Sequence, residues 1–254
     1  MSLKLRENYK VEFDRIDFNG KISINGLCSY MQMIAANHAS LLGFNYYKNS
    51  DTPEYYWILS RVKYVIETYP RWEDEVKVET YPGGYDKLFA VRLFDFYNQE
   101  DQKIGYIIGD YILMDAVKKR PARIKGATGT LAFLDFPYEG ECLEKLRIPS
   151  KEELNDLQVI KVERRKAFYS EMDLNEHMNN AHYIRWIVDV LPIEWLKTHE
   201  ISSLEVNYNT AITCGTEVDV LLIQNESKEY MIYGSSIDGN INYFASRLKL
   251  RCMD

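Results

Sequence analysis

The chain lacks the residue patterns that build metal centres, disulfide frameworks and phosphate-binding loops. Its four cysteines lie far apart, with no CxxC pair and no Cys/His spacing of the kind that binds zinc. We therefore expect no metal site, and we interpret Cys28, Cys142, Cys214 and Cys252 as buried thiols. No GxGxxG or P-loop pattern occurs, so we expect no nucleotide and no other cofactor.

Long hydrophobic runs are also missing. No segment approaches the roughly 20 apolar residues that span a bilayer, and the amino end, MSLKLRENYK, has no apolar signal-peptide core. With 46% hydrophobic and 27% charged residues, the composition is that of an ordinary globular protein. We therefore expect a cytoplasmic protein with no membrane span. A net charge of −7, without interleaved basic and aromatic residues, argues against a nucleic-acid partner.

An internal repeat divides the chain. The segment Ile16–Lys21 (IDFNGK) matches Met172–His177 (MDLNEH) in the pattern apolar, Asp, apolar, Asn, any, basic. A helical segment, an apolar strand ending near Tyr64 or Tyr208, and a Glu-Val-x-Val strand follow each copy. Pro, Gly and charged residues between the copies indicate a linker. We predict an N-terminal domain at 1–140, a linker at 141–157 and a C-terminal domain at 158–254.

Two helices and two antiparallel meanders are expected. Ile24–Phe44 has no charged face, which predicts a helix buried on all sides, and Tyr183–Leu191 predicts a second helix. Pro82-Gly83-Gly84 is a turn signal between strands. The predicted strands are Tyr56–Thr68, Glu75–Tyr81, Lys87–Tyr97, Lys103–Asp115, Glu217–Gln224, Glu229–Ile237 and Asn242–Arg251.

The second copy of the repeat carries polar groups at alternate positions. If Asp173–His177 is extended, its period of two places Asp173, Asn175 and His177 on one face. The first copy carries Lys21 where the second carries His177, so only the second keeps a ring that titrates near neutral pH. Asn179 and Asn180 precede the second helix, where they are expected to cap it and form its turn.

The DFNG, WILSR, KKRPARI, DLNEHMNN, YIRWI and VNY segments together resemble bacterial acyl-acyl-carrier-protein thioesterases, related to the plant FatA and FatB enzymes. The resemblance implies an α+β chain of two tandem hot-dog folds, each an antiparallel sheet wrapped around a long central helix. It also implies hydrolysis of fatty acyl-carrier thioesters in fatty acid biosynthesis. The family motif D-x-N-x-H-x-N-N places Asp173, Asn175 and His177 in the active site.

Thioester hydrolysis needs a base or nucleophile, a donor to the oxyanion, and a proton shuttle or orienting group. Asp173, Asn175 and His177 fit these roles in that order. Many relatives carry a Glu three residues after the VNY tyrosine, where this chain has Ala211. The repeat predicts Glu67 as the matching residue of the first copy. Cys214, in an apolar surrounding, is expected to be inert.

The resemblance implies two further sites. Acyl carrier proteins are acidic, so docking on this acidic chain requires a local basic patch. Two segments, VKKRPARIK and KVERRK, supply the candidates, which are Lys118, Lys119, Arg120, Arg123, Arg164 and Arg165. The acyl chain needs an apolar slot beside the first helix. Its candidates are Met31, Met33, Ile34 and Leu41, although ordinary core packing is the better explanation for any one of them.

Two rival functions stay open. A hot-dog hydratase or dehydratase uses Asp and His on an acyl thioester without hydrolysing it. A non-catalytic acyl-carrier binding protein is the second alternative, suggested by Ala211 in place of the family Glu. Assembly as a homodimer is open as well.

Overall fold

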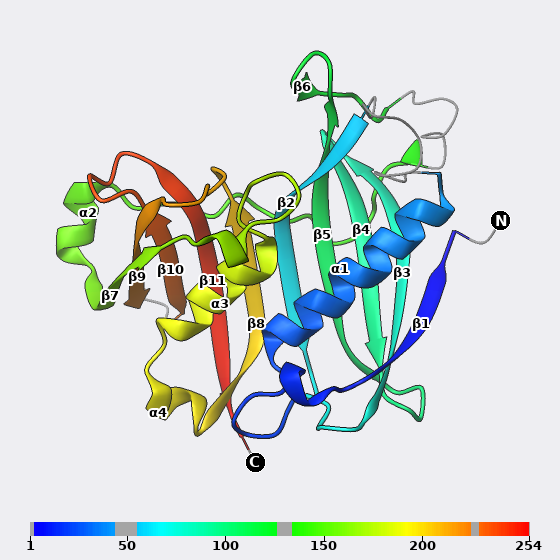
Figure 1. Ribbon diagram of the computed structural model, residues 1–254, viewed down its shortest axis with the longest axis horizontal. Coiled ribbons are helices and arrows are strands. Elements are labelled where there is room, and N and C mark those ends of the chain that lie inside the picture. The colour runs from blue at the N-terminus through cyan, green and yellow to red at the C-terminus, as the bar shows by residue number, and fades with distance from the viewer. Residues whose placement is uncertain (1–2, 44–54, 126–133, 225–228, 254) are drawn as a thin grey trace. The chain divides into compact units, whose positions relative to one another are not determined.

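The computed structural model describes residues 3–43, 55–125, 134–224 and 229–253 (Figure 1). The chain divides into two compact units, Met1–Leu143 and Glu144–Asp254. The finer division into 1–140, 141–157 and 158–254 stays a prediction. None of the helices in the described ranges is long and apolar enough to cross a bilayer.

The first unit is an antiparallel sheet with one long helix, α1 (Ile24–Leu41), lying across it (Figure 1). The sheet order is β1-β3-β4-β5-β2, and a short strand β6 pairs with β5. Its strands are β1 (Leu5–Lys10), β2 (Tyr55–Ile66), β3 (Glu75–Asp86), β4 (Phe89–Tyr97), β5 (Lys103–Asp115) and β6 (Arg120–Pro121).

The helix α1 begins where Ser23 accepts a hydrogen bond from the Gly26 N–H, at 3.0 Å. Its first half is buried, but Met33 and Leu41 are 46% and 58% exposed. The prediction of burial on all sides is therefore wrong, because the sheet covers α1 from one side and leaves small and polar residues such as Asn37 outside. Phe44, the predicted helix end, lies outside the described residues.

The second unit repeats the first. Its sheet order, β7-β9-β10-β11-β8, matches β1-β3-β4-β5-β2 strand for strand. The strands are β7 (Gln158–Lys166), β8 (His199–Tyr208), β9 (Glu217–Gln224), β10 (Tyr230–Ser235) and β11 (Asn242–Cys252). The helices are α2 (Lys151–Asp156), α3 (Asn180–Asp189) and α4 (Ile193–Leu196). The internal repeat is thus confirmed, although α3 has 10 residues where α1 has 18.

One turn signal was misread. Strand β3 runs through Pro82-Gly83-Gly84, and its register against β4 shifts there, between Pro82 and Gly84. Gly84 has φ +95°, and a Cβ at that position would lie 2.3 Å from the Phe136 carbonyl oxygen. The glycine therefore allows a bulge and a close approach of backbone, not a chain reversal. The reversal falls at Lys87, with φ +53°.

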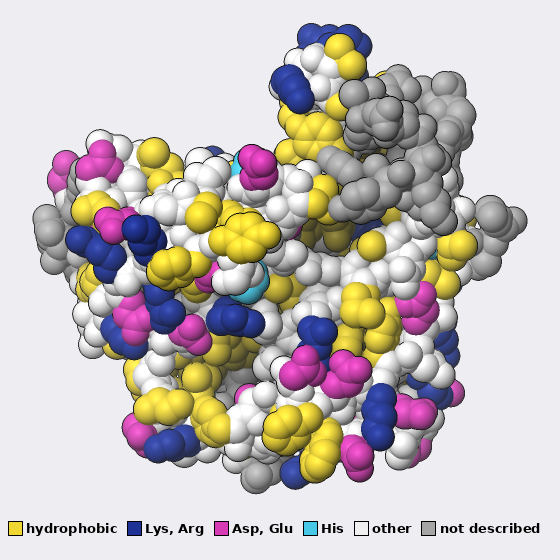
Figure 2. All heavy atoms as spheres, in the orientation of Figure 1, with side chains coloured by type: hydrophobic (Ala, Val, Ile, Leu, Met, Phe, Trp, Pro, Cys, Tyr) yellow, Lys and Arg dark blue, Asp and Glu magenta, His cyan; other side chains and the backbone are white. Residues whose placement is uncertain are grey.

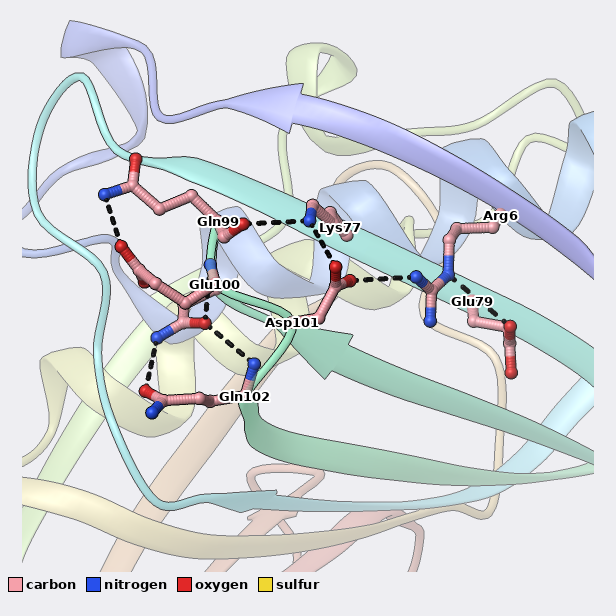
Figure 3. A network of polar contacts seen from close by, with 8 residues as sticks. Arg6, Lys77, Glu79, Gln99, Glu100, Asp101 and Gln102 are labelled. Carbon is pink, nitrogen blue, oxygen red and sulfur yellow. Dashed lines mark hydrogen bonds and ion pairs between the residues drawn. The ribbon is translucent and has the colours of Figure 1, made fainter.

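The edge strand β1 is fastened by a polar network (Figure 3). Asp101, in the turn between β4 and β5, pairs with Lys77 of β3 at 2.9 Å and with Arg6 of β1 at 3.0 Å. Asn98 shapes that turn by accepting the N–H groups of Glu100 and of Gln102. These contacts tie the β4–β5 turn to the two strands beside it.

The cysteine interpretation is wrong for three of four residues. Cys28 is buried, and burial raises the pKa of its thiol to about 12. Cys142, Cys214 and Cys252 are exposed. Cys142 lies in an irregular segment, Cys214 in a turn and Cys252 at the end of β11.

Candidate active site

The five residues from Asp173 to His177 form a closed turn, not an extended strand. The Asp173 N–H donates to the His177 carbonyl at 2.7 Å, and the Glu176 N–H donates to the Asp173 carbonyl at 3.0 Å. Asp173 Oδ1 accepts the Asn175 N–H at 2.7 Å. The predicted alternation of faces is wrong, because the aspartate side chain bonds its own backbone and reverses the chain. The turn still gathers the three candidate side chains in one short segment.

The first copy forms the same turn with different side chains. The Asp17 N–H donates to the Lys21 carbonyl at 2.8 Å, the Gly20 N–H donates to the Asp17 carbonyl at 3.0 Å, and Asp17 Oδ1 accepts the Asn19 N–H at 2.8 Å. The fourth residue is left-handed in both turns, with φ +71° at Gly20 and +61° at Glu176. The aspartate is therefore a structural residue in both copies, and the last position differs in chemistry.

The turn of the second unit rests on the segment that leads into β9. The Met178 N–H donates to the Ile212 carbonyl at 2.8 Å, and His177 forms a bridge with Thr213. The Ile212 N–H donates to the Tyr183 hydroxyl at 3.0 Å. Burial, and to a lesser degree the charge of Asp173, raise the pKa of Tyr183 to about 12. Tyr183, which the sequence did not single out, thus fixes the wall behind the turn.

The three candidate groups remain accessible. Asp173 is half-buried, and Asn175 and His177 are exposed. In the described part of the chain, Asp173 Oδ2 and the His177 ring make no hydrogen bond to protein. Carboxylate, amide and imidazole groups in such a turn can supply a base or nucleophile, a donor and a proton carrier.

Asn179 and Asn180 have the predicted structural roles. Asn179 Oδ1 accepts the Ala181 N–H at 2.9 Å and caps α3, of which Asn180 is the first residue.

The match between Glu67 and Ala211 is wrong. After β2, the N–H groups of Glu67 and the next residue both donate to the Ile104 carbonyl, at 2.8 and 3.1 Å. After β8, the N–H groups of Asn209 and the next residue both donate to the Tyr243 carbonyl, at 2.9 and 3.1 Å. Glu67 therefore corresponds to Asn209. The sequence match aligned the tyrosines that end the two predicted strands, which shifts the register by two residues.

A cavity of about 200 Å³ lies in the first unit between α1 and the sheet. The cavity exists because α1 carries small alanine side chains there, and apolar or aromatic side chains form most of its wall. Its lining residues are Ala35, Ala36, Ala39, Trp57, Pro82, Ala90, Val91, Arg92, Tyr111 and Leu134.

None of the four predicted slot residues lines this cavity. Met31 and Ile34 are buried in the core, whereas Met33 and Leu41 are exposed. The sequence pointed to large apolar residues, but the space arises where the helix carries alanine. The assignment of these four to acyl binding stays a prediction.

Among the described residues that line the cavity, one is charged, Arg92, for which the sequence gives no signal. Arg92 Nη1 donates to His38 Nδ1 at 2.9 Å, and Thr80 Oγ1 lies 3.5 Å from the same nitrogen. Burial, then the charge of Arg92, lower the pKa of His38 to about 4, so that the ring is neutral at pH 7. Burial lowers the pKa of Arg92 as well.

The two basic segments differ in their partners. Lys118 pairs with Asp115 at 3.0 Å, but Lys119, Arg120 and Arg123 are exposed, and no carboxylate pairs with them in the described ranges. This segment forms the β5–β6 hairpin, where Figure 2 shows basic and hydrophobic side chains together. The hydrophobic Val117 there is 83% exposed.

The other segment is internally neutralised. Arg164 makes a two-point contact with Asp219, at 2.9 and 3.1 Å. Arg165 pairs with Glu163 at 2.6 Å and with Asp189 at 3.2 Å. Its positive charge is largely cancelled by its neighbours.

Among the described residues, no group of three or more His, Cys, Asp or Glu side chains is arranged to hold a metal ion.

Family models cover most of the chain. The acyl-ACP thioesterase N-terminal domain matches residues 2–128, and the acyl-ACP thioesterase C-terminal domain matches residues 154–246. The chain belongs to the acyl-ACP thioesterase family. A crystal structure of an acyl-ACP thioesterase from Bacteroides thetaiotaomicron has a TM-score of 0.83 at 25% identity, covering 99% of this chain and 100% of that one.

Other acyl-ACP thioesterases are similar along most of the chain. The oleoyl-acyl carrier protein thioesterase of Coriandrum sativum is 25% identical, over 86% of this chain and 62% of that protein. The palmitoyl-acyl carrier protein thioesterase of Gossypium hirsutum is 27% identical, over 85% and 53%. The chain thus spans little more than half the length of these curated relatives. The 12:0-ACP thioesterase of Umbellularia californica shares the fold, with a TM-score of 0.82 at 18% identity and coverage of 100% and 99%. The predicted α+β fold of two tandem hot-dog units is confirmed.

Proposed function

We propose that this protein hydrolyses fatty acyl-acyl-carrier-protein thioesters to free fatty acid and carrier protein, in fatty acid biosynthesis. The observation that carries the proposal is the Asp173–His177 turn, in a chain that belongs to the acyl-ACP thioesterase family. The curated relatives, of which the chain spans little more than half, are named for this reaction on oleoyl and palmitoyl carriers.

In the proposed reaction, Asp173 acts as base or nucleophile through Oδ2, the oxygen that the turn leaves unused. A new C–O bond forms at the thioester carbonyl, the C–S bond breaks, and the thiolate leaves and takes a proton. Asn175 donates to the oxyanion, and His177 carries the proton or orients the attacking water. The Asx hydrogen bond from Asn175 to Asp173 Oδ1 holds the carboxylate in place.

The carrier is proposed to dock on the β5–β6 hairpin. Lys119, Arg120 and Arg123 are exposed without carboxylate partners in the described ranges, and Val117 adds apolar surface. Arg164 and Arg165 are weaker candidates, because they already form ion pairs with acidic neighbours. Long-range attraction of an acidic partner favours the segment whose charge is uncompensated.

The acyl chain is proposed to enter the cavity beside α1. At about 200 Å³ it exceeds the roughly 150 Å³ that suffices for benzene in an engineered apolar cavity. We place the reaction in the cytoplasm. A homodimer stays a prediction, for which light scattering on the purified chain is the test.

The test is free thiol release from an acyl-carrier substrate. A thioesterase releases thiol at a rate proportional to enzyme. A hydratase or dehydratase changes only the acyl absorbance, and a binding protein does neither. Thiol release by wild type that persists at the same rate in Asp173→Asn would contradict the assignment of the site.

A further inference from the structure

Arg92 is a cation in an apolar cavity, and none of the described residues that line this cavity carries a carboxylate. Its contacts in the described ranges are the His38 ring and the Thr80 hydroxyl, and both lie against one nitrogen, Nη1. The Nε and Nη2 groups have no acceptor in the same ranges. An uncompensated guanidinium facing an apolar space is costly, so its retention points to a ligand that completes it.

The unused side of the guanidinium has the geometry of a carboxylate site. Nε–H and Nη2–H point the same way and form a fork that matches the two oxygens of a carboxylate. His38 and Thr80 fix the opposite side, so the fork is held in orientation. Thr80 is itself anchored, because its hydroxyl donates to the Leu93 carbonyl at 3.0 Å.

A second donor group lines the same cavity as Arg92, the Tyr111 phenol. His38 lies on the Nη1 side and is 2% exposed. Because Arg92 donates to Nδ1, the neutral His38 ring carries its proton on Nε2 and cannot compensate the charge of the guanidinium. None of the described residues that line the cavity is acidic.

We propose that the cavity receives acyl chains that carry a carboxylate at the end remote from the thioester, and that Arg92 binds this carboxylate through Nε and Nη2. His38 is a positioning residue that holds the guanidinium. The inference rests on the proposed function, since it names the substrate class of the same site. A purely hydrocarbon chain leaves the fork unpaired, whereas a terminal carboxylate neutralises it.

The test compares acyl-pantetheine thioesters in matched pairs of six, eight and ten carbons, with a methyl or a carboxylate end. Wild type is expected to favour the carboxylate end of at least one pair, by about 10- to 100-fold in kcat/KM, the effect of one charged hydrogen-bonded contact. Arg92→Met removes the charge at similar volume and is expected to abolish or reverse the preference. Arg92→Lys keeps the charge without the fork and is expected to retain part of it.

The matched control is Arg6→Met, whose guanidinium pairs with Asp101 outside the cavity. It is expected to leave the preference unchanged. If Arg92→Lys lowers kcat/KM equally for the methyl and the carboxylate substrate of each pair, the inference is overturned. A wild-type preference for the methyl end at every length would overturn it as well. A thioester of the same length with a terminal hydroxyl is the third substrate, and a preference for it over the carboxylate would overturn the inference and assign a neutral oxygen.

Calorimetric binding of the free acids separates this inference from the proposed function. If wild type hydrolyses no thioester but binds the dicarboxylic acid more tightly than the matched fatty acid, and Arg92→Met does not, the function fails and the inference stands. If thioesters are hydrolysed and the two acids bind equally, the inference fails alone.

Discussion

The two units present the same backbone turn with different chemistry. In each, an aspartate side chain accepts the N–H two residues on, and a left-handed fourth residue closes the chain. The turn ends in Lys21 in the first unit and in His177 in the second. The aspartate alone therefore does not mark an active site, because Asp17 has the same structural role as Asp173. The groups that accompany it decide whether the turn can carry a reaction.

The helices differ in a complementary way. The helix α1 carries alanines over a cavity, whereas the shorter α3 buries larger side chains, those of Tyr183, Ile184, Trp186 and Ile187. In the first unit the helix leaves an apolar cavity, and in the second unit the turn before the helix presents polar side chains. Under the proposed function, the first unit would bind the acyl chain and the second would carry the reaction.

Substitution of the two aspartates is expected to change kcat by very different amounts. Asp173→Asn keeps an oxygen for the Asn175 N–H but removes the carboxylate, so kcat is expected to fall by about 10² to 10⁴. Asp17→Asn is the matched control and is expected to leave kcat within about twofold of wild type. Steady-state thiol release measures both. Equal losses would mean that the substitution acts through the fold of the turn.

A second prediction concerns equivalent strand positions. Asp110 of β5 lies opposite Arg61, and its counterpart on β11, Lys249, lies opposite Ser203 and pairs with Glu229 at 3.0 Å. Asp110 is buried, and burial, first of all, raises its carboxyl pKa from 3.8 to about 7.

The Asp110 carboxyl group makes the stability of the fold depend on pH. Between about pH 4 and 7, folded Asp110 holds a proton that the unfolded chain releases, so stability falls as pH rises through this window. Asp110→Asn is expected to flatten this dependence and to raise stability at pH 8 by on the order of 2 kcal/mol, or about 5 °C in Tm. Thermal melts from pH 5 to 8 test it. A variant that retains the wild-type slope would show that another group titrates.

The two basic segments give a third contrast. Arg120→Glu with Arg123→Glu is expected to raise KM for the acyl-carrier substrate about tenfold at low salt, because the loss of steering acts on association. A small pantetheine thioester is expected to be unaffected. Arg164→Glu with Arg165→Glu breaks ion pairs with Asp219 and Glu163, so it is expected to lower Tm with little change in KM. Equal changes on both substrates would mean that the hairpin supports folding, not docking.

Substitutions at the left-handed residue of each turn are expected to change the thermal stability only slightly. Gly20 has φ +71°, and nothing lies within 4 Å of an added Cβ. Gly20→Ala is therefore expected to destabilise the fold only through the left-handed backbone conformation, by about 1 kcal/mol. The expected fall in Tm is roughly 2 to 4 °C. Glu176→Gly relieves the same strain at φ +61° but increases the entropy of the unfolded chain, so its gain is expected to be smaller. Thermal melts of both variants decide whether the two turns are energetically equivalent.

The sequence predicts the repeat, most of the strands and the motif, because these depend on spacing along the chain. It does not predict the strand order, since the expected meander would place β2 beside β3, whereas β2 pairs with β5. It failed where a side chain bonds to its own backbone. The alternating pattern predicts an extended Asp173–His177 segment, but the Asp173 side chain reverses the chain there. Gly84 is typical of a turn, but in this structure it makes room for the Phe136 carbonyl group beside a strand. Arg92 gave no signal, since one arginine in a strand looks like a surface residue until the fold places it over a cavity. The sequence favours bulky apolar residues as the acyl slot, whereas the cavity lies where Ala35, Ala36 and Ala39 leave space.

The last residue of the turn distinguishes the two copies chemically, and exchanging it between them is the decisive experiment. Thiol release from one acyl-carrier substrate is measured for His177→Lys, which gives the second turn the residue of the first, and for Lys21→His. His177→Lys is expected to lower kcat by about 10²-fold or more, while Lys21→His is expected to stay within about twofold of wild type. A folded His177→Lys protein with near wild-type turnover would mean that the histidine takes no part in the reaction.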